Sequence, residues 1–450
     1  MPDSESPTAL PERLQKSFET HAAKVGVIGL GYVGLPLVRA FTHTGYPTTG
    51  FDTDSSKIEK LNAGNPTSAT CPAADIAAMN ATGTFSATGD FADLAEMDAI
   101  LICVPTPLAH NREPDLSYVT ATTETIAEHL RPGQLIVLES TTYPGTTRDI
   151  VRPLLERGGL KSGRDFFLAY SPEREDPGNT QHRTTGIPKL VGGDGEVALT
   201  LACALYGEVI ERVVPVSSPE IAEAAKLTEN IFRSVNIALV NELKAVYAKM
   251  GIDVWEVIEA AKTKPFGYMP FYPGPGLGGH CIPIDPFYLS WKAQQAGYPT
   301  RFIELAGEIN SAMPLYVIDT LAGALHARFA KSLSGARILL IGIAYKKNVD
   351  DVRETPAFHL IEILESRGAE VAFYDPYAPE IPTTREHAAL AGRTSVAWDP
   401  AAFEAYDAAL ICTDHDCINF DALVANARLV LDTRNATRTV KEGRDKIVSA

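Results

Sequence analysis

The segment 24–41 reads KVGVIGLGYVGLPLVRAF, and its glycines constrain the fold more than any other feature of the chain. Gly29, Gly31 and Gly34 follow an apolar run that is typical of a buried parallel strand, and a helical pattern comes directly after them. The first glycine permits a tight turn, the second lets a pyrophosphate approach the backbone, and the third lets the helix pack closely on the strand. The segment therefore predicts a strand–turn–helix unit that binds a dinucleotide.

A second short strand, TTGFD, ends at Asp52, about 20 residues beyond the glycines. A carboxylate at this place can accept hydrogen bonds from both ribose hydroxyls, and it repels the 2′-phosphate of NADP. NAD is therefore the expected cofactor. The alternative is a glycine-rich turn in a sheet that holds no ligand.

Strands and helices continue to alternate, which is typical of a doubly wound parallel sheet. Segments 98–107 (DAILICVPTP) and 134–145 (QLIVLESTTYPG) read as further strands that run into loops. The last third of the chain repeats this pattern, because DAALICTDH at 407–415 resembles DAILICVPT. We interpret this as an internal duplication. The second copy has GIAYKK in place of GLGYVG, so we expect it to bind something other than a dinucleotide.

Between the two copies the pattern is helical, from about Pro219 to Lys262 and again from Arg301 to Ala330. We therefore predict an α/β protein with two Rossmann-like, doubly wound parallel-sheet domains joined by a helical middle region with a long central helix. The predicted parts are a polar N-terminal extension with one short helix (1–22), an NAD-binding domain (23–215), a central helical domain with a cysteine loop (216–332) and a C-terminal α/β domain (333–450).

Composition excludes several classes of protein. The net charge of −16 argues against binding to nucleic acid or to an anionic membrane surface. The six cysteines are scattered without CxxC spacing, which argues against a disulfide framework or a zinc site, and we expect no metal. No apolar run is long enough to span a membrane, and the N-terminus lacks the apolar core of a signal peptide. We expect a cytoplasmic protein with reduced thiols.

The segment GLGGHCIPIDPF at 276–287 places one cysteine in a predicted loop rich in glycine and proline. Cys281 is a candidate nucleophile, and a buried small residue without a function is the alternative. Asp285 follows four residues later and could orient a water or an ammonium group. Adjacent side chains diverge in an extended loop, so we do not expect His280 to activate Cys281.

Polar residues also occur at positions that are typical of catalytic groups. Lys226, Asn230 and Arg233 share one face of the predicted long helix. Glu173 follows a short strand, FFLAY, at the edge where α/β enzymes place catalytic groups. A solvated polar stripe and a surface acid are the alternative readings of these two features.

The first loop of the second α/β copy, YKKNVDDVRET at 345–355, carries Lys346, Lys347 and Arg353. These cations could neutralise phosphates. An exposed run of charges is the alternative.

Together these stretches resemble the UDP-glucose/GDP-mannose dehydrogenase family over nearly the whole chain, from about residue 24 to 440. They are, in order, GVIGLGYVGLPL, VPTP, ESTTYPGTT, SPERE, KLTENIFRSVNIALVNE, GGHCIPIDP and KKNVDDVRE. AYSPEREDPGN and GPGLGGHCIPIDPFYLSWKA resemble the branch that acts on UDP-N-acetylhexosamines. UDP-N-acetylglucosamine is the first expected substrate, UDP-N-acetylmannosamine the second, and UDP-glucose a further alternative.

The resemblance implies a four-electron oxidation of the sugar C6 that uses two NAD⁺ in turn, for surface polysaccharide precursors. The thiolate of Cys281 forms a thiohemiacetal and then a thioester, which is hydrolysed to the uronate. By position, Lys226 stabilises oxyanions at C6, and Asn230 helps to hold that oxygen or a water. Asp285 interacts with this water and with Lys226. Glu173 corresponds to the general base of thioester hydrolysis, and Thr142 to a hydroxyl near the reacting centre.

The resemblance also implies binding residues and partners. Those for NAD are Gly29, Gly31, Tyr32, Val33, Gly34, Asp52, Lys57, Val104, Thr106 and Thr142. Those for the UDP-sugar are Glu173, Lys226, Asn230, Phe271, Tyr272, Gly274, Gly279, Lys346 and Arg353. A homodimer or higher homo-oligomer is expected. The helix at 301–330 is either the dimer core, as in the family, or a linker between domains of one chain.

Two departures from the family pattern weaken UDP-glucose specificity. Ile284 stands where a lysine often precedes the aspartate, and Pro177 stands where a second glutamate follows Glu173. Two other classes of function stay open. A two-electron dehydrogenase would share the glycine turn but would have no need of Cys281, and a non-catalytic NAD-binding regulator would have no reason to keep Lys226, Glu173 and Cys281 together.

Overall fold

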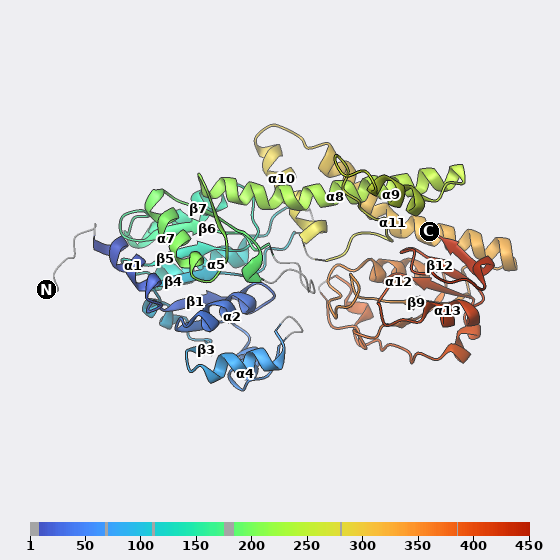
Figure 1. Cartoon of the computed structure of the whole chain (residues 1–450), viewed down its shortest axis with the longest axis horizontal. Coiled ribbons are helices and arrows are strands. Elements are labelled where there is room, and N and C mark those ends of the chain that lie inside the picture. The colour runs from blue at the N-terminus through green and yellow to red at the C-terminus, as the bar shows by residue number, and fades with distance from the viewer. Residues whose placement is uncertain (1–8, 68–70, 110–112, 175–183, 280, 385) are drawn as a thin grey trace. The chain divides into compact units, whose positions relative to one another are not determined.

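The computed structural model divides into two compact units, which we describe separately (Figure 1). The first comprises Met1–Glu229 and Phe287–Tyr298, and the second comprises Asn230–Pro286 and Pro299–Ala450. The residues that the structure describes are 9–67, 71–109, 113–174, 184–279, 281–384 and 386–450. His280 and Pro177, singled out above, lie outside them.

The first unit is built on an eight-stranded sheet with the order β3-β2-β1-β4-β5-β6-β7-β8. Its strands are β1 (Val25–Ile28), β2 (Thr48–Phe51), β3 (Phe85–Thr88), β4 (Ala99–Ile102), β5 (Leu135–Leu138), β6 (Phe167–Tyr170), β7 (Lys189–Gly193) and β8 (Val213–Val216). Every neighbouring pair is parallel except β6 and β7, which are antiparallel. The described residues between these two strands contain only a 3₁₀ turn, η4 (Thr184–Gly186), and not the helix that usually covers a parallel crossover.

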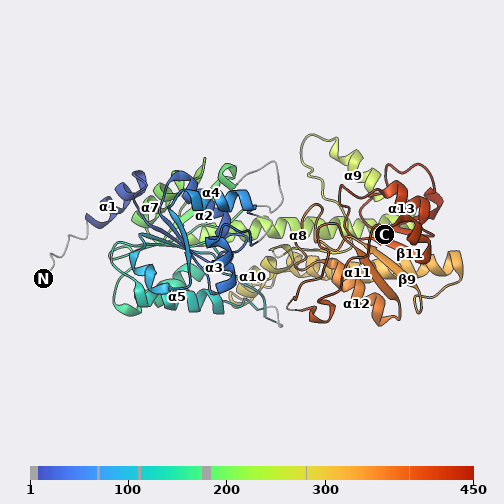
Figure 2. The ribbon, with the colours of Figure 1, turned by 90° about the horizontal axis from the view of Figure 1, so that it is seen from below.

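Helices cover both faces of this sheet, which confirms the predicted doubly wound fold (Figures 1 and 2). Alternate residues of β4 point to opposite faces. Ala99 and Leu101 join a core with α1 (Ala9–Glu19), α2 (Gly34–Thr44), α4 (Ala73–Ala81) and α7 (Glu196–Gly207). Ile100 and Ile102 join a core with α5 (Ser117–His129), η2 (Thr147–Val151) and α6 (Arg152–Leu155). Shorter elements are α3 (Ser55–Asn62), η1 (Phe91–Glu96) and η3 (Glu156–Gly158).

The N-terminal segment contains the short helix that the sequence predicts. In α1, Leu14 and Phe18 are buried in the same core as α2 and α7. This helix is therefore packed as part of the first unit and is polar only on its outer side.

The second unit carries a five-stranded, wholly parallel sheet with the order β10-β9-β11-β12-β13. Its strands are β9 (Arg337–Ile341), β10 (Glu370–Tyr374), β11 (Ala408–Ile411), β12 (Val430–Asp432) and β13 (Ile447–Ser449). Helices α11 (Phe302–Phe329) and α12 (Pro356–Ser366) pack on one face, and α13 (Phe420–Asn426) packs on the other. The short elements are η5 (Ala388–Leu390), η6 (Pro400–Ala405) and η7 (Arg444–Lys446). The order of its first four strands corresponds to β2-β1-β4-β5 of the first sheet, as a duplication requires.

The long central helix is α8 (Pro219–Met250), with 32 residues. Gly251 ends it in the left-handed region, at φ +71°, as the sequence predicts. The pattern that continues to Lys262 is a separate helix, α9 (Val254–Lys262), whose N-cap Asp253 accepts a hydrogen bond from the Trp255 N–H. Among the described residues, no helix has both the length and the apolar character needed to cross a membrane.

The prediction of a loop around Cys281 is wrong, because Cys281 is the first residue of α10 (Cys281–Gln295). Pro283 lies in the first helical turn, where the missing N–H has no intrahelical partner to lose, so the helix tolerates it. Glycines in left-handed conformations, Gly276 (φ +144°) and Gly279 (φ +83°), precede the helix. As a result, positions 281 and 285 lie one helical turn apart on one face of α10.

Candidate active site

The glycine turn after β1 has the geometry that its sequence predicts. Gly29 has φ +94°, and a Cβ there would lie 2.6 Å from the Cys103 carbonyl oxygen. A Cβ on Gly34 would lie 2.0 Å from the Gly29 carbonyl oxygen, so α2 could not pack here with a side chain. A Cβ on Gly31 would meet no atom of the described residues within 4 Å. Two glycines thus serve internal packing, and the third leaves the backbone open on the side where a pyrophosphate would approach.

Asp52 follows β2, and its side chain is 9 % exposed. Its carboxylate accepts hydrogen bonds from the Leu30 N–H at 2.9 Å, the Asp54 N–H at 3.0 Å and the Lys57 ammonium at 2.7 Å. Burial alone would raise the pKa of Asp52, but these hydrogen bonds outweigh it and lower the pKa below its ordinary value. Asp52 is therefore ionised at neutral pH, as an acceptor for ribose hydroxyls must be. Lys57, also predicted for NAD, is its ion-pair partner.

The remaining residues predicted to contact NAD lie on loops after three neighbouring parallel strands. Tyr32 and Val33 follow β1, Val104 and Thr106 follow β4, and Thr142 follows β5. The carboxyl ends of these strands form one edge of the sheet, which is where open α/β sheets bind ligands. The Tyr288 hydroxyl donates to the Thr106 carbonyl oxygen at 2.5 Å and so fixes this loop.

The loop after β5 contains a polar atom without a partner. Thr142 is fully buried, and its Oγ1 makes no hydrogen bond within the described part of the chain. The neighbouring turn is held by Glu223 of α8, which accepts from the Gly145 N–H at 2.6 Å and the Thr147 N–H at 2.9 Å. A buried hydroxyl left unsatisfied in a rigid loop fits a position that a ligand completes.

Glu173, the predicted general base, lies beside a buried charge network that the sequence analysis missed. Its Oε2 lies 3.7 Å from the Nζ of Lys189, whose ammonium also donates to Glu139 at 2.8 Å. The Tyr206 hydroxyl donates to the other oxygen of Glu139. Lys189 begins β7 and Glu139 follows β5, so only the fold brings them together.

Lys226 and Asn230 lie one turn apart on α8, as predicted, and both are buried. The solvated-stripe alternative for these two side chains is therefore wrong, because neither faces solvent. Asn230 donates through Nδ2 to an Asp285 carboxylate oxygen at 2.5 Å, and its Oδ1 accepts from the Arg233 guanidinium. Asp285 is 2 % exposed. Asp285, which lies one helical turn beyond Cys281, is thus hydrogen-bonded to Asn230, and Asn230 in turn binds Arg233.

The second unit contains a pocket of about 690 Å³. Its lining combines aromatic and basic side chains with two acids: Trp255, Glu259, Lys262, Tyr272, Pro273, Tyr345, Lys346, Lys347, Thr413, Asp414, Arg434, Asn435 and Arg438. The rings of Trp255 and Tyr272 stack with centroids 5.8 Å apart and planes 14° apart. A flat apolar wall beside several cations is suited to a nucleotide, since a base can stack and phosphates can pair with Lys and Arg.

Some residues predicted to bind the UDP-sugar lie in this pocket and others beside it. Tyr272 and Lys346 line it. Phe271 instead packs edge-to-face on Phe232, with centroids 5.6 Å apart, and the Arg353 guanidinium binds both oxygens of Asp351.

The two predicted glycines allow close packing. A Cβ on Gly274 would lie 2.6 Å from Nη1 of Arg434, and one on Gly279 would lie 3.0 Å from the Tyr345 ring. Arg434, which the sequence analysis missed, follows β12 and donates through Nε to the Cys412 carbonyl oxygen at 2.9 Å. Its place in the segment LDTRN, two residues after the end of a predicted strand, is the signal that could have identified it.

The second sheet differs from the first at the residue that corresponds to Asp52. Asp375 follows β10, and its side chain is fully buried. Its carboxylate accepts from the Ile343 and Ala344 N–H groups at 2.7 and 3.0 Å, and His415 Nε2 lies 3.1 Å away. Asp52 also accepts from the backbone, but Asp375 differs because it is fully buried and paired with His415, which is consistent with the lost glycine turn.

These features define an NAD-dependent dehydrogenase with a second α/β unit for a nucleotide-bearing substrate. The chain belongs to the UDP-glucose/GDP-mannose dehydrogenase family. The family's NAD binding domain matches residues 23–210, its central domain residues 220–312 and its UDP binding domain residues 339–439. The resemblance stated from the sequence and the predicted use of NAD are both confirmed, and the chain is a UDP-sugar dehydrogenase.

Two relatives are similar over most of their length. A UDP-N-acetyl-D-glucosamine 6-dehydrogenase of Pseudomonas aeruginosa is 37% identical, over 79% of this chain and 83% of the relative. A UDP-N-acetyl-D-mannosamine dehydrogenase of Pyrococcus horikoshii is 35% identical, over 92% of this chain and 95% of the relative. A solved structure of a UDP-D-ManNAc dehydrogenase from Pyrococcus horikoshii superposes with a TM-score of 0.84, covering 95% of this chain and 98% of that one at 33% identity.

Proposed function

We propose that this enzyme oxidises C6 of a UDP-N-acetylhexosamine to the uronic acid, with UDP-N-acetylglucosamine as the preferred substrate. UDP-N-acetylmannosamine is the second candidate. The support is the branch-like sequence around Cys281, the departures at Ile284 and Pro177, and relatives named for these two sugars at 37% and 35% identity. UDP-glucose is the third candidate.

One observation carries the proposal of covalent catalysis. Cys281 begins a helix, and one turn later Asp285 is buried against Asn230. The buried Asp285 carboxylate accepts from the Asn230 amide, and the same amide binds Arg233. These bonds hold the carboxylate in one orientation. A cysteine with no chemical role would have no need of such a neighbour, whereas a nucleophile that forms a hydrolysable thioester needs a positioned water.

The chemistry divides between NAD and the residues of this chain. When bound, NAD⁺ accepts a hydride from C6 in each of the two oxidations. Cys281 adds its sulfur to the C6 aldehyde and gives a thiohemiacetal, whose oxidation gives a thioester. Water then cleaves the C–S bond, which releases the carboxylate and regenerates the thiol.

Polar residues serve the charged states of this sequence. Lys226 stabilises the oxyanion at C6, and Asn230 with Asp285 holds that oxygen or the attacking water. Glu173 removes a proton from the water, and the Lys189 ammonium lies 3.7 Å from its carboxylate. Thr142 offers its unsatisfied Oγ1 to NAD or to the substrate.

The pocket of the second unit holds the UDP group in this proposal. Tyr272, stacked on Trp255, provides a flat surface for the uracil, and Lys346 and Arg434 pair with the diphosphate. Arg353, which the family resemblance implies for UDP binding, belongs to the same segment as Lys346. It contributes by holding that segment in position.

The number of NADH formed per sugar consumed tests the proposal. Two NADH per uronate supports it, one per product indicates a two-electron dehydrogenase, and none indicates an NAD-binding regulator. Cys281→Ser should stop at an early intermediate while NAD binding persists. Cys417→Ser, at an exposed cysteine, is the matched control. Full turnover by Cys281→Ser would disprove the covalent mechanism.

A panel of UDP-glucose, UDP-GlcNAc, UDP-GalNAc and UDP-ManNAc tests the substrate. A clear preference for UDP-glucose in kcat/KM would overturn the assignment to the N-acetylhexosamine branch.

We further propose that the product is a precursor of surface polysaccharide, that the enzyme works in the cytoplasm and that it is a homodimer or higher oligomer. Light scattering of the purified protein tests its assembly.

A further inference from the structure

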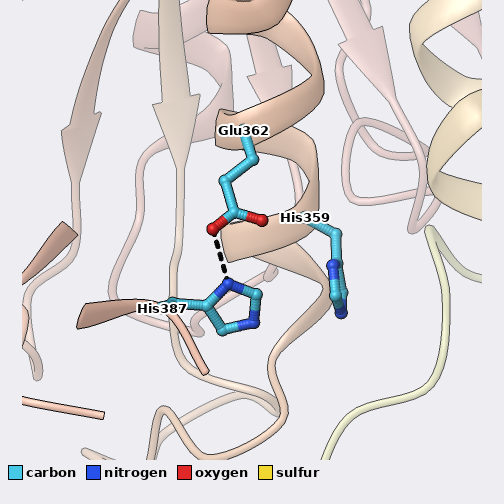
Figure 3. Close-up of side chains that lie close together, drawn as sticks. All are labelled: His359, Glu362 and His387. Carbon is cyan, nitrogen blue, oxygen red and sulfur yellow. Dashed lines mark hydrogen bonds and ion pairs between the residues drawn. The ribbon is translucent and has the colours of Figure 1, made fainter. Parts of the chain in front are cut away.

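Two histidines and a glutamate gather in the second unit, and none of them lines its nucleotide pocket (Figure 3). His359 and Glu362 lie on α12 at a spacing of three, so they project from one face of that helix. His387 immediately precedes η5, in the connection between β10 and β11. One nitrogen or oxygen from each residue lies within 4.8 Å of the others.

The orientation of His387 is fixed by Glu362. A hydrogen bond of 2.7 Å joins His387 Nδ1 to Glu362 Oε1. Because an ionised carboxylate can only accept, Nδ1 carries the proton in this pair and the lone pair of a neutral ring lies on Nε2. Histidines that bind metals are usually held in this way, with the other ring nitrogen donating to a carboxylate.

The second nitrogen of His387 is an independent indication of a missing ligand. The His387 side chain is 9 % exposed, and its Nε2 has no hydrogen-bond partner among the described residues. A buried ring nitrogen with a free lone pair costs stability unless something binds it. The ring of His359 lies beside it, with centroids 4.8 Å apart and planes 82° apart.

We propose that His359 and His387 bind a divalent transition-metal ion, with zinc as the best fit, and that Glu362 orients His387. Imidazole nitrogens suit zinc, copper and nickel, whereas magnesium and calcium prefer oxygen ligands. Water completes the coordination, since His359 is exposed to solvent. The sequence analysis expected no metal because it considered cysteine ligands, and 27 residues separate His359 from His387 in the chain.

The metal would join α12 to the connection that carries His387. The first residue of α12, Pro356, lies against the glycine segment before Cys281, because a Cβ on Gly276 would be 3.1 Å from the Pro356 Cβ. Bound zinc should stabilise the second unit, because it would hold these two segments together.

The test is a titration of Zn²⁺ into the chelator-treated full-length protein, followed by calorimetry and by thermal unfolding. We expect one strong site per chain, lost in His359→Ala and in His387→Gln. Glu362→Gln should weaken it about 10- to 100-fold, the range typical of a residue that orients a ligand. His326→Gln changes an exposed histidine of α11 outside the cluster and should bind zinc like the wild type.

Cobalt distinguishes this site from Cys281 and from nonspecific binding. Co²⁺ held by imidazole lacks the sulfur-to-cobalt charge-transfer band that a thiolate gives. A cobalt spectrum without that band, abolished by His359→Ala, supports the proposal. Unchanged stoichiometry and affinity in His359→Ala would overturn it, and this variant keeps its fold because His359 is exposed. If the enzyme forms two NADH per sugar but binds no zinc, the proposed metal site is wrong and the proposed function still stands.

Discussion

The ammonium of Lys189 lies 2.8 Å from the carboxylate of Glu139, and both side chains are almost completely inaccessible to solvent. Burial alone would lower the pKa of Lys189, but Glu139 and Glu173 outweigh it and hold the pKa above its ordinary value. The lysine is therefore charged at all physiological pH values. It connects the interior of the first unit to the candidate general base.

Lys189→Met should destabilise the protein by about 3–5 kcal/mol, because it leaves the Glu139 carboxylate buried without a counter-ion. Urea unfolding measures this change in the free energy of unfolding. The double variant Lys189→Met/Glu139→Gln removes the stranded charge and should recover most of the loss. If the double variant is as unstable as the single one, the pair does not behave as a buried ion pair.

Asp52→Ser should weaken NAD binding about 10- to 100-fold, because the ribose hydroxyls lose a charged acceptor. The same change should improve the ratio of NADP to NAD affinity, since it removes the repulsion of the 2′-phosphate and frees Lys57. Fluorescence titration measures both affinities. Asp93→Asn, at an exposed acid of η1, should alter neither of them. An unchanged cofactor preference would argue against the role given to Asp52.

Asn230→Ala should reduce kcat about 10²- to 10³-fold, the range for a lost donor to a developing oxyanion. NAD and UDP affinities should stay within about twofold of the wild type, since Asn230 is assigned to the sugar C6 and does not line the pocket assigned to the UDP group. Asn236→Ala is the control, because its amide donates to the Phe232 carbonyl oxygen on the same helix. Equal losses in the two variants would indicate a helix defect instead.

Arg434→Ala should weaken UDP binding about 10- to 100-fold, since it removes a cation that lines the pocket. Arg353→Ala should have a smaller effect, because that guanidinium binds Asp351. Calorimetry with UDP alone separates binding from catalysis. Arg367→Ala, whose surface ion pair with Asp319 lies outside the lining, serves as the control. A larger loss in Arg353→Ala than in Arg434→Ala would contradict our placement of the diphosphate.

Lys244 should make stability depend on pH. Burial, helped by the nearby Arg434, lowers the pKa of Lys244 to about 7. Between pH 7 and the pKa of the unfolded chain, the unfolded state binds more protons. The stability therefore rises with pH across this window, and the penalty is fully present below pH 7.

Lys244→Met removes this dependence. The difference in unfolding free energy between the variant and the wild type should shrink by about 1.4 kcal/mol per pH unit from pH 7.5 to 9.5. Urea unfolding at several pH values checks the slope. Lys249→Met, at an exposed lysine of the same helix, should give a flat difference. A flat line for Lys244→Met would show that the lysine stays charged.

The sequence predicts the parts of the site whose signal is local. Gly29, Gly34 and Asp52 follow from strand, turn and spacing, because their roles are set within one strand–turn–helix unit. The start of α10 at Cys281 could not be predicted, since glycine and proline usually mark a loop, whereas here Pro283 lies in the first turn of a helix and Pro286 lies inside it.

The residues that the sequence analysis missed depend on contacts between distant segments. Lys189 looks like an ordinary strand residue until the sheet order brings it to Glu139. Arg434 and His387 are likewise defined by neighbours from other strands and helices. Pattern and spacing contain no information on such pairs, so only the fold could reveal them.

The engagement of Asp375 has a consequence for how the two halves of the chain have diverged. Both acids accept hydrogen bonds from the backbone, but the Asp52 side chain is 9 % exposed and paired with Lys57, whereas Asp375 is fully buried and lies 3.1 Å from His415. Restoring the glycines alone would therefore not make the second copy a dinucleotide site. The acid that we assign to the cofactor in one unit has its counterpart built into the stability of the other, where it is fully buried.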